Sequence, residues 1–255
     1  MTPKFSPLFG QAAGAYVAGR PEYPSELFDR ILAAVPIQRR QRAMDLGAGT
    51  GKSTAPLLPH FREVIAVEPD VRMAEKLRAC APEAEVHVAT AEDAAQEPES
   101  VDLITIATAL HWMDIPRVMD RIAVWLRAGG VLAVSGGKFP GTPEPVAAVA
   151  RREFSEHWNA HCDPRLRLTE TSEHAVRAAR EFRLLEDALI AHVAELTPRE
   201  LAGFCRSTSY GAAYARSLAD PEAYWRELEM RFQKAWNQNR ISVDFSPWLL
   251  LARKE

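Results

Sequence analysis

Residues at alternate positions, Asp45, Gly47, Gly49 and Gly51, have the types and spacing of a tight turn that binds a nucleotide-like ligand. Glycine has no Cβ atom, so its backbone can approach a ligand closely and can adopt conformations that other residues avoid. The next residue, Lys52, is of a type that binds phosphate groups. The stretch therefore raises the question of which ligand the turn holds.

Spacing separates three ligand classes. A phosphate-binding P-loop needs a glycine five residues before Gly51, and Leu46 occupies that position. A dinucleotide-binding turn needs a third glycine three residues after Gly49, where Lys52 stands instead. A nucleoside triphosphate is thus disfavoured most and a dinucleotide less. What remains is an acidic residue followed by three alternating glycines.

A second acidic residue, Glu68, lies 21 residues after Gly47, at the expected end of a strand. A carboxylate at this position accepts hydrogen bonds from ribose hydroxyls in dinucleotide sites. Glu68 therefore favours an adenosine-type ligand without identifying it. The alternative role, capping the next helix, is better served by Asp70.

An adjacent histidine and tryptophan, His111 and Trp112, follow the apolar run 101–107. Imidazole can act as a base or a hydrogen-bonding partner, and indole can exclude water from a reacting group. The alternative is that Trp112 only packs on the following helix and that His111 caps it. Tyr210 and Tyr214, after a Ser-Thr-Ser turn, are further candidate pocket residues.

Alternating strands and helices must position these side chains. Apolar runs predict strands at 43–46, 63–68, 85–89, 101–107 and 131–135, and helical spacing predicts helices at 52–60, 69–79 and 115–127. This alternation predicts a doubly wound, Rossmann-like α/β sheet. Loops at the carboxyl ends of its strands would then bring the glycine turn, Glu68 and His111 to one crevice.

The acid-x-Gly-x-Gly-x-Gly pattern resembles motif I of the class I S-adenosylmethionine (SAM) dependent methyltransferases. The run 107–114, Ala-Thr-Ala-Leu-His-Trp-Met-Asp, resembles small-molecule methyltransferases related to trans-aconitate methyltransferase, as do segments 16–24 and 200–209. The resemblance covers most of the chain, although only the first 135 residues carry sharp motifs. It implies SAM as cofactor and a small-molecule oxygen or nitrogen acceptor, such as a carboxylate or a heterocycle.

The resemblance also implies roles for individual residues. Asp45 would organise the turn and the amino group of SAM, and adenine would be recognised after the third strand. Thr90 stands there in place of the aspartate of many relatives, so that Ala91, Glu92 or Asp93 would substitute for it. The residues expected at the cofactor are Asp45, Gly47, Ala48, Gly49, Gly51, Glu68, Pro69, Met73, Thr90, Ala91, Glu92, Ala107, Arg20 and Tyr16.

The acceptor side is expected to include His111, Trp112, Tyr23 and Tyr210. His111 is the candidate base for a hydroxyl or ring-nitrogen acceptor, whereas a carboxylate acceptor needs no base. The segment 5–23 has spaced aromatic residues and glycines and is expected to fold over the cofactor, where Arg20 or Tyr23 could reach the methionine carboxylate.

The resemblance divides the chain into parts. Residues 1–36 are expected to form an N-terminal helical cover and 37–137 the SAM-binding α/β core. After the breaker-rich stretch 136–145, helical spacing at 146–159, 172–180, 198–207 and 221–236 predicts a mainly helical substrate cover over 138–240. Residues 241–255 would supply a strand that completes the core sheet.

Other functions remain open at this point. An enzyme of the same fold could cyclise or cleave SAM intramolecularly, or the chain could bind SAM without turnover. An NAD-dependent oxidoreductase is disfavoured by Lys52 and by the lack of a recognisable Tyr-x-x-x-Lys pair. His157, His161 and Cys162 have the spacing of metal ligands, but no fourth ligand is evident and we expect no metal.

Composition sets the remaining limits. The chain has 255 residues, 47% hydrophobic and 25% charged, which suffices for a sizeable core, and its net charge of −3 gives no reason to expect nucleic acid. Three isolated cysteines fit a reduced, cytoplasmic setting. The first residues lack the apolar core of a signal peptide, and no apolar run approaches the length of a membrane span. We expect a monomer or homodimer acting on a small molecule.

Overall fold

The computed structural model describes residues 19–137 and 139–255. The first half of the expected N-terminal cover, residues 1–18 including Tyr16, lies outside these residues. Among the helices in the described ranges, none is both long enough and apolar enough to cross a membrane.

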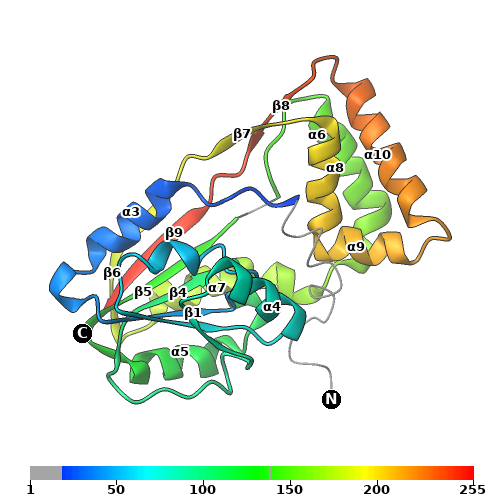
Figure 1. The fold of residues 1–255 in the computed structure, drawn as a ribbon. Coiled ribbons are helices and arrows are strands. Elements are labelled where there is room, and N and C mark those ends of the chain that lie inside the picture. The colour runs from blue at the N-terminus through cyan, green and yellow to red at the C-terminus, as the bar shows by residue number, and fades with distance from the viewer. Residues whose placement is uncertain (1–18, 138) are drawn as a thin grey trace.

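Within the described residues, seven strands form a central sheet in the order β3-β2-β1-β4-β5-β9-β6 (Figure 1). The first five strands pair in parallel, whereas β9 is antiparallel to both β5 and β6. The strand order reverses between β1 and β4, and ligands of such sheets bind outside the carboxyl ends at that point. The strands are β1 (Arg42–Leu46), β2 (Glu63–Val67), β3 (Glu85–His87), β4 (Val101–Ala107), β5 (Leu126–Gly136), β6 (Phe182–Leu189) and β9 (Trp248–Lys254).

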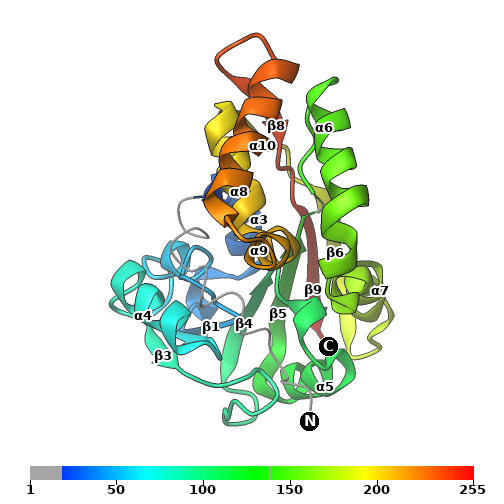
Figure 2. The same ribbon diagram turned by 90° about the vertical axis from the view of Figure 1, so that its right-hand side faces the viewer.

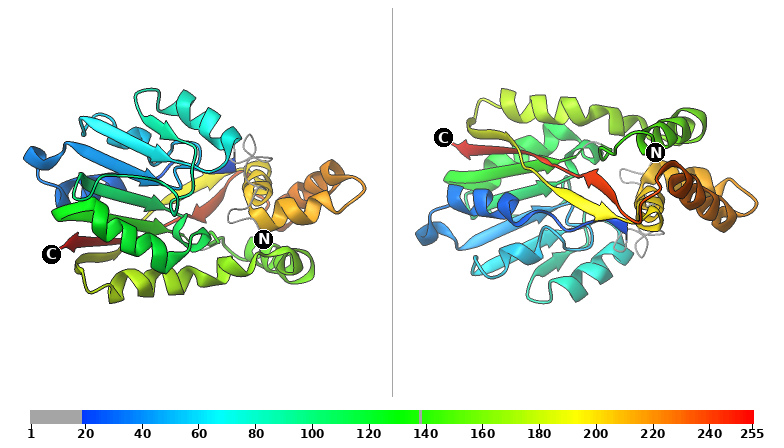
Figure 3. Two further views of the ribbon diagram at one scale, coloured as in Figure 1. Left: turned by 90° about the horizontal axis from the view of Figure 1, so that it is seen from below. Right: turned by 90° about the horizontal axis from the view of Figure 1, so that it is seen from above.

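Helices cover both faces of this sheet (Figure 3). In β4, Leu103 packs toward α3 (Ser25–Ala34), whereas Ile104 and Ile106 pack toward α5 (Ile115–Trp125). This two-residue alternation is the reason that an apolar strand can be buried on both faces. Helix α4 (Val71–Cys80) lies on the α3 face, and α7 (Thr169–Ala178) lies on the α5 face. The expected doubly wound α/β fold is thus confirmed.

A second group of helices, here called the cover, rises beyond the carboxyl ends of the strands (Figures 1 and 2). It has a core of its own, in which Trp158 and Phe232 are fully buried. The Trp158 indole N–H donates to the Tyr224 hydroxyl at 2.8 Å, and that hydroxyl donates to Glu153 at 2.8 Å. The cover consists of α6 (Val146–Glu153), α8 (Pro198–Ser207), α9 (Ser209–Arg216), α10 (Pro221–Ala235) and the antiparallel pair β7 (Val193–Leu196) and β8 (Ile241–Asp244).

The range 138–240 is less uniform than expected. Its middle part, α7 and β6, belongs to the central sheet, because β6 pairs with β9 at the sheet edge and Val176 of α7 is buried in the core of the sheet. The cover is therefore built from two stretches of chain on either side of β6. Residues 241–255 are also divided, since β8 pairs with β7 in the cover and only β9 completes the central sheet.

The expected helix at 52–60 is replaced by turns and a short 3-10 helix, Ala55–Leu57. Two prolines explain the difference. Pro56 lies at the start of the 3-10 helix, and neither Pro56 nor Pro59 has an N–H to continue an α-helical hydrogen-bond pattern.

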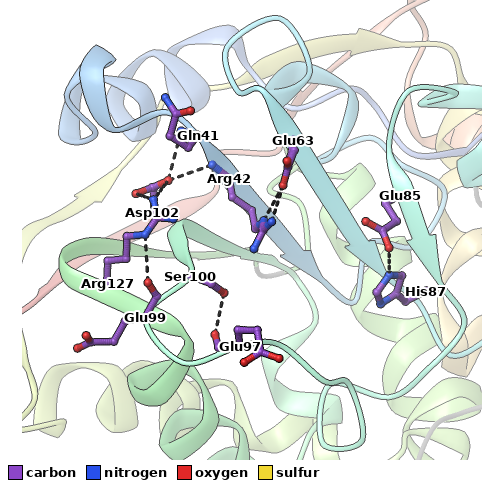
Figure 4. Close-up of polar contacts among 10 residues, drawn as sticks. All are labelled: Gln41, Arg42, Glu63, Glu85, His87, Glu97, Glu99, Ser100, Asp102 and Arg127. Carbon is purple, nitrogen blue, oxygen red and sulfur yellow. Dashed lines mark hydrogen bonds and ion pairs between the residues drawn. The ribbon is translucent and has the colours of Figure 1, made fainter.

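Polar contacts also hold the strands at the end of the sheet where β1 and β4 begin, opposite to the glycine turn (Figure 4). The buried Asp102 carboxylate accepts hydrogen bonds from the backbone N–H groups of Gln41 and Arg42 and pairs with Arg127 at 2.8 Å. These contacts hold β1 and β4 together where both strands begin. The paired strands then end side by side, β1 at the glycine turn and β4 at Ala107.

Candidate functional site

The glycine turn leaves β1 with three residues in the left-handed region, Gly47, Gly49 and Gly51, at φ of 70°, 58° and 93°. A Cβ atom on Gly47 would lie 2.6 Å from the Ala109 Cβ, and one on Gly51 would lie 2.8 Å from the Leu77 Cδ1. These two glycines are required by packing. A Cβ on Gly49 would meet only the Met73 Cε, at 3.9 Å, so Gly49 faces open space.

Asp45 lies inside the protein beneath this turn. Its carboxylate is fully buried and accepts hydrogen bonds from the hydroxyls of Ser53, Thr54 and Thr105 at 2.6–2.8 Å. Burial raises the pKa of Asp45, and the three hydroxyls oppose that rise. The expected role in organising the turn fits this geometry. The expected contact with the amino group of SAM does not, because the carboxylate has no exposed surface.

Glu68 stands at the end of β2 beside the turn. One carboxylate oxygen accepts the Gly49 N–H at 2.9 Å, and the other accepts the Asp70 N–H at 2.9 Å. Burial raises the pKa of Glu68, and these two backbone donors oppose the rise. Asp70 caps α4 by accepting from the N–H groups of Arg72 and Met73. The carboxylate of Glu68 is thus held in one orientation next to Gly49.

The loop after β3 is fastened by its own side chains. Ala91 is buried in the sheet core, and the Glu92 carboxylate accepts the Asp114 N–H at 2.7 Å. Asp93 accepts the Thr90 hydroxyl at 3.0 Å and pairs with Arg117 at 3.1 Å. Both acidic side chains that were expected to replace the missing aspartate are therefore engaged within the protein, Glu92 with the start of α5 and Asp93 with both Thr90 and α5.

A cleft of about 830 Å³, including its open mouth, lies between the glycine turn, the end of β4, the segment 20–24 and the cover. Residues from distant parts of the chain line it. Those expected from the sequence are Arg20, Tyr23, Gly47, Ala48, Gly49 and Ala107. One lining residue, Thr108, has a φ of 54°, a strained conformation for a β-branched residue.

The segment 20–24 lines this cleft and contacts both the glycine turn and the cover. The Lys52 ammonium donates to the Arg20 carbonyl at 2.6 Å and pairs with Glu22 at 2.8 Å. The Arg20 side chain donates to the Ser207 hydroxyl at 3.1 Å and lies over the Phe204 ring of α8. The Tyr23 hydroxyl is 3.3 Å from the Thr108 hydroxyl. Lys52 therefore connects the turn to a segment that also contacts the cover.

His111 lines a hollow that adjoins the main cleft. This hollow, about 270 Å³ including open solvent, is also lined by Trp248 and the residues 108–110 and 135–137, and it shares Thr108 and Gly137 with the main cleft. Burial, and to a smaller extent the charge of the nearby Arg165, lower the pKa of His111 to about 4 against the opposing charge of Asp163. The Arg165 guanidinium covers the Trp112 ring at 4.9 Å. His111 is thus a neutral imidazole at physiological pH and a weak base.

Tyr210 does not reach the cleft or the hollow. Its ring packs on Phe154 and Trp158, and burial raises the pKa of its hydroxyl. Tyr214 stacks on His157 at 4.9 Å between ring centroids. In the described residues, no group of three or more His, Cys, Asp or Glu side chains is placed to hold a metal ion.

The structure adds residues that the sequence did not single out. His192, Phe204, Phe245 and Pro247 line the main cleft from the cover side, and Trp248 lines the smaller hollow. They come from three separate segments and share no local motif, so no sequence signal marked them.

Comparisons with known proteins agree with this arrangement. Residues 44–134 match the family described as a methyltransferase domain. An uncharacterized methyltransferase of Mycobacterium bovis is 42% identical over 126 residues, 49% of this chain and 50% of that protein. A trans-aconitate 2-methyltransferase of Methylobacterium radiotolerans is 38% identical over 108 residues, 41% of each chain.

A solved structure from Anaeromyxobacter dehalogenans, described as a candidate type II methyltransferase, has a TM-score of 0.74 and 26% identity, and covers 92% of this chain and 97% of that one. The alignments span about half the length of the curated relatives that the chain matches. Residues 44–134 therefore match a methyltransferase domain, and the whole described chain is similar in fold to a solved methyltransferase structure.

Proposed function

We propose that the chain is a SAM-dependent methyltransferase that acts on a small-molecule oxygen or nitrogen acceptor. One observation carries the proposal: Gly49 lines the cleft with open space where its Cβ would be, and its N–H fixes the Glu68 carboxylate next to it. The residues present therefore fit a ligand that needs close backbone approach and a ribose partner. The name of the Methylobacterium relative makes a carboxylate such as trans-aconitate the first acceptor to test.

In this proposal, each part of the site has a distinct task. The turn at Gly47–Gly51 and the Glu68 carboxylate would hold the cofactor, with Met73 and the loop at Thr90 and Ala91 near its adenine. SAM supplies an electrophilic methyl group when bound. The cover and the segment 20–24 would align the acceptor and exclude water, which accounts for much of the acceleration of a displacement reaction.

The low pKa of His111 makes it a poor general base. A general base works best with a pKa near the pH of the reaction, and the pKa of His111 is about 4. We therefore assign His111 to hydrogen bonding on the acceptor side instead of proton removal. A carboxylate acceptor needs no base, which is consistent with this assignment.

Calorimetry with SAM, S-adenosylhomocysteine and NAD tests the cofactor. Binding of the first two without NAD is expected, and binding of NAD alone would overturn the proposal. Product analysis then tests the reaction. Methylated acceptor formed together with S-adenosylhomocysteine supports transfer, whereas breakdown of SAM without acceptor would indicate an intramolecular reaction, and binding without product would indicate a non-catalytic module.

A further inference from the structure

The wall of the main cleft that faces the glycine turn comes entirely from the cover side. We call it the far wall and define it as His192, Phe204, Phe245 and Pro247. His192 belongs to the connection between β6 and β7, Phe204 to α8, and the other two to the connection between β8 and β9. Three of its four side chains are apolar, so His192 is its principal hydrogen-bonding group.

Backbone hydrogen bonds hold the far wall together. The Phe245 N–H donates to the His192 carbonyl at 2.8 Å, and the Ile190 N–H donates to the Pro247 carbonyl at 2.9 Å. The Ser246 hydroxyl accepts the His192 N–H at 3.0 Å. The Phe204 and Phe245 rings meet edge to face at 5.2 Å. These contacts hold the far wall in place without a ligand. Such preorganisation lowers the cost of ordering side chains when a ligand binds.

The imidazole of His192 has unused hydrogen-bonding capacity. Its Nε2 atom is covered by protein and has no hydrogen-bond partner within the described residues. Native proteins pair nearly all their buried polar atoms, because an unpaired one is destabilising, so this atom marks a position where a partner is missing. Rotation of a histidine ring about χ2 is nearly two-fold and exchanges each nitrogen with a carbon, so Nε2 can leave this covered position while His192 still lines the cleft.

We propose that His192 binds the methyl acceptor, and that the far wall takes a small molecule with an apolar, ring-sized body and one hydrogen-bonding group. The inference rests on the proposed function, which assigns the opposite wall, with Gly49 and Glu68, to the cofactor. A ligand on the far wall is then the acceptor. Phe204, Phe245 and Pro247 contact its body, and the imidazole bonds its hydroxyl or carboxylate.

Binding of three ring-sized probes to the protein saturated with S-adenosylhomocysteine tests this inference. Phenol offers a neutral hydroxyl, benzoate offers an anion, and toluene offers no hydrogen-bonding group. Affinities and the ring-nitrogen signals of His192 are followed by NMR on protein labelled in its histidines. We expect phenol or benzoate to bind about tenfold more tightly than toluene, as one hydrogen bond provides, and to shift the His192 signals.

Substitutions of His192 test whether this side chain, and not the rest of the cleft, causes the preference over toluene. His192→Leu is expected to abolish the preference over toluene, and His192→Asn to retain part of it. His60→Asn changes an exposed histidine that does not line the cleft and is expected to keep the full preference. Affinity for S-adenosylhomocysteine, measured first by calorimetry, is expected to be the same in all variants.

The outcomes are distinct. A preference for phenol alone assigns a neutral hydroxyl acceptor, and a preference for benzoate alone assigns a carboxylate; both support the inference. Equal binding of all three probes to the parent, or a preference that survives in His192→Leu, overturns it while cofactor binding still stands. Failure of the parent to bind S-adenosylhomocysteine overturns the proposed function itself.

Discussion

The three glycines of the turn, Gly47, Gly49 and Gly51, have different surroundings. Side chains at Gly47 and Gly51 would collide with Ala109 or Leu77, whereas Gly49 has no such neighbour. Its φ of 58° favours glycine on backbone grounds alone, and the open space beside it leaves room for the proposed cofactor next to Glu68.

The variant Gly49→Ala is therefore expected to fold and to lose cofactor binding. A non-glycine residue in the left-handed region costs about 1 to 2 kcal/mol, and the new methyl group would occupy the open space of the cleft. Gly203→Ala is the matched control, because its Cβ would meet no atom within 4 Å. Calorimetry with SAM checks both variants. Parental affinity in folded Gly49→Ala would mean that the site is misplaced.

The low pKa of His111 predicts a pH-dependent stability. The unfolded imidazole binds a proton near pH 6.5, but the folded one does so only near pH 4. Between these values the unfolded state holds more protons, so the stability contribution is complete above pH 6.5 and is lost as the pH falls toward 4. The loss is at most about 3 kcal/mol. Urea unfolding at several pH values should show a flatter profile for His111→Gln, and a profile parallel to that of the parent would contradict the burial argument.

Some of the site was predictable from residue spacing alone. The glycine turn, Glu68 and the cap at Asp70 follow from local patterns, because each depends on neighbours in sequence. The orientation of Asp45 into the core was not predictable, since Thr105 contacts it from another strand. His192 and Phe245 were missed for the same reason, because only the fold brings their segments together.

At the scale of elements, four of the five strands predicted before residue 136, β1, β2, β4 and β5, are central and largely buried, whereas the fifth, β3, lies at the sheet edge with its residues partly exposed. Strand β4 matches its expected range at both ends because five of its seven residues are apolar, and its two polar residues, Asp102 and Thr105, are buried with them. Strand β6 carries Arg183, Glu186 and Asp187 among its apolar residues, because it lies at the sheet edge and is half exposed, and this mixture concealed it. The antiparallel placement of β9 likewise depends on pairings that no local pattern encodes.

Lys52 is the link between two elements, the glycine turn and the segment 20–24. Lys52→Met removes the ammonium and keeps most of the apolar stem, so we expect faster hydrogen exchange in peptides that span 19–24 and SAM binding weakened by about three- to tenfold. Arg226→Met removes an exposed charge from α10, where its 3.9 Å pair with Asp220 is weak, and serves as control. Unchanged exchange in Lys52→Met would remove the linking role.

At the scale of the whole molecule, the cover and the sheet are not separable units. The chain enters the cover after β5, returns to the sheet as α7 and β6, and enters the cover again before ending in β9. The main cleft lies where these crossings meet, so its two walls belong to different hydrophobic cores, one in the sheet and one in the cover. A ligand in the cleft would touch both.

This arrangement predicts that ligand binding stabilises the whole chain in a single transition. A ligand that binds only the folded state at 100 times its Kd adds about 2.7 kcal/mol, which corresponds to a rise in Tm of about 5 to 10 °C for a chain of this size. S-adenosylhomocysteine is expected to produce this shift in calorimetric scans, NAD at the same concentration is not, and Gly49→Ala should show none with either ligand. Two separate transitions, with only one moved by S-adenosylhomocysteine, would show instead that the cover unfolds independently of the cofactor site.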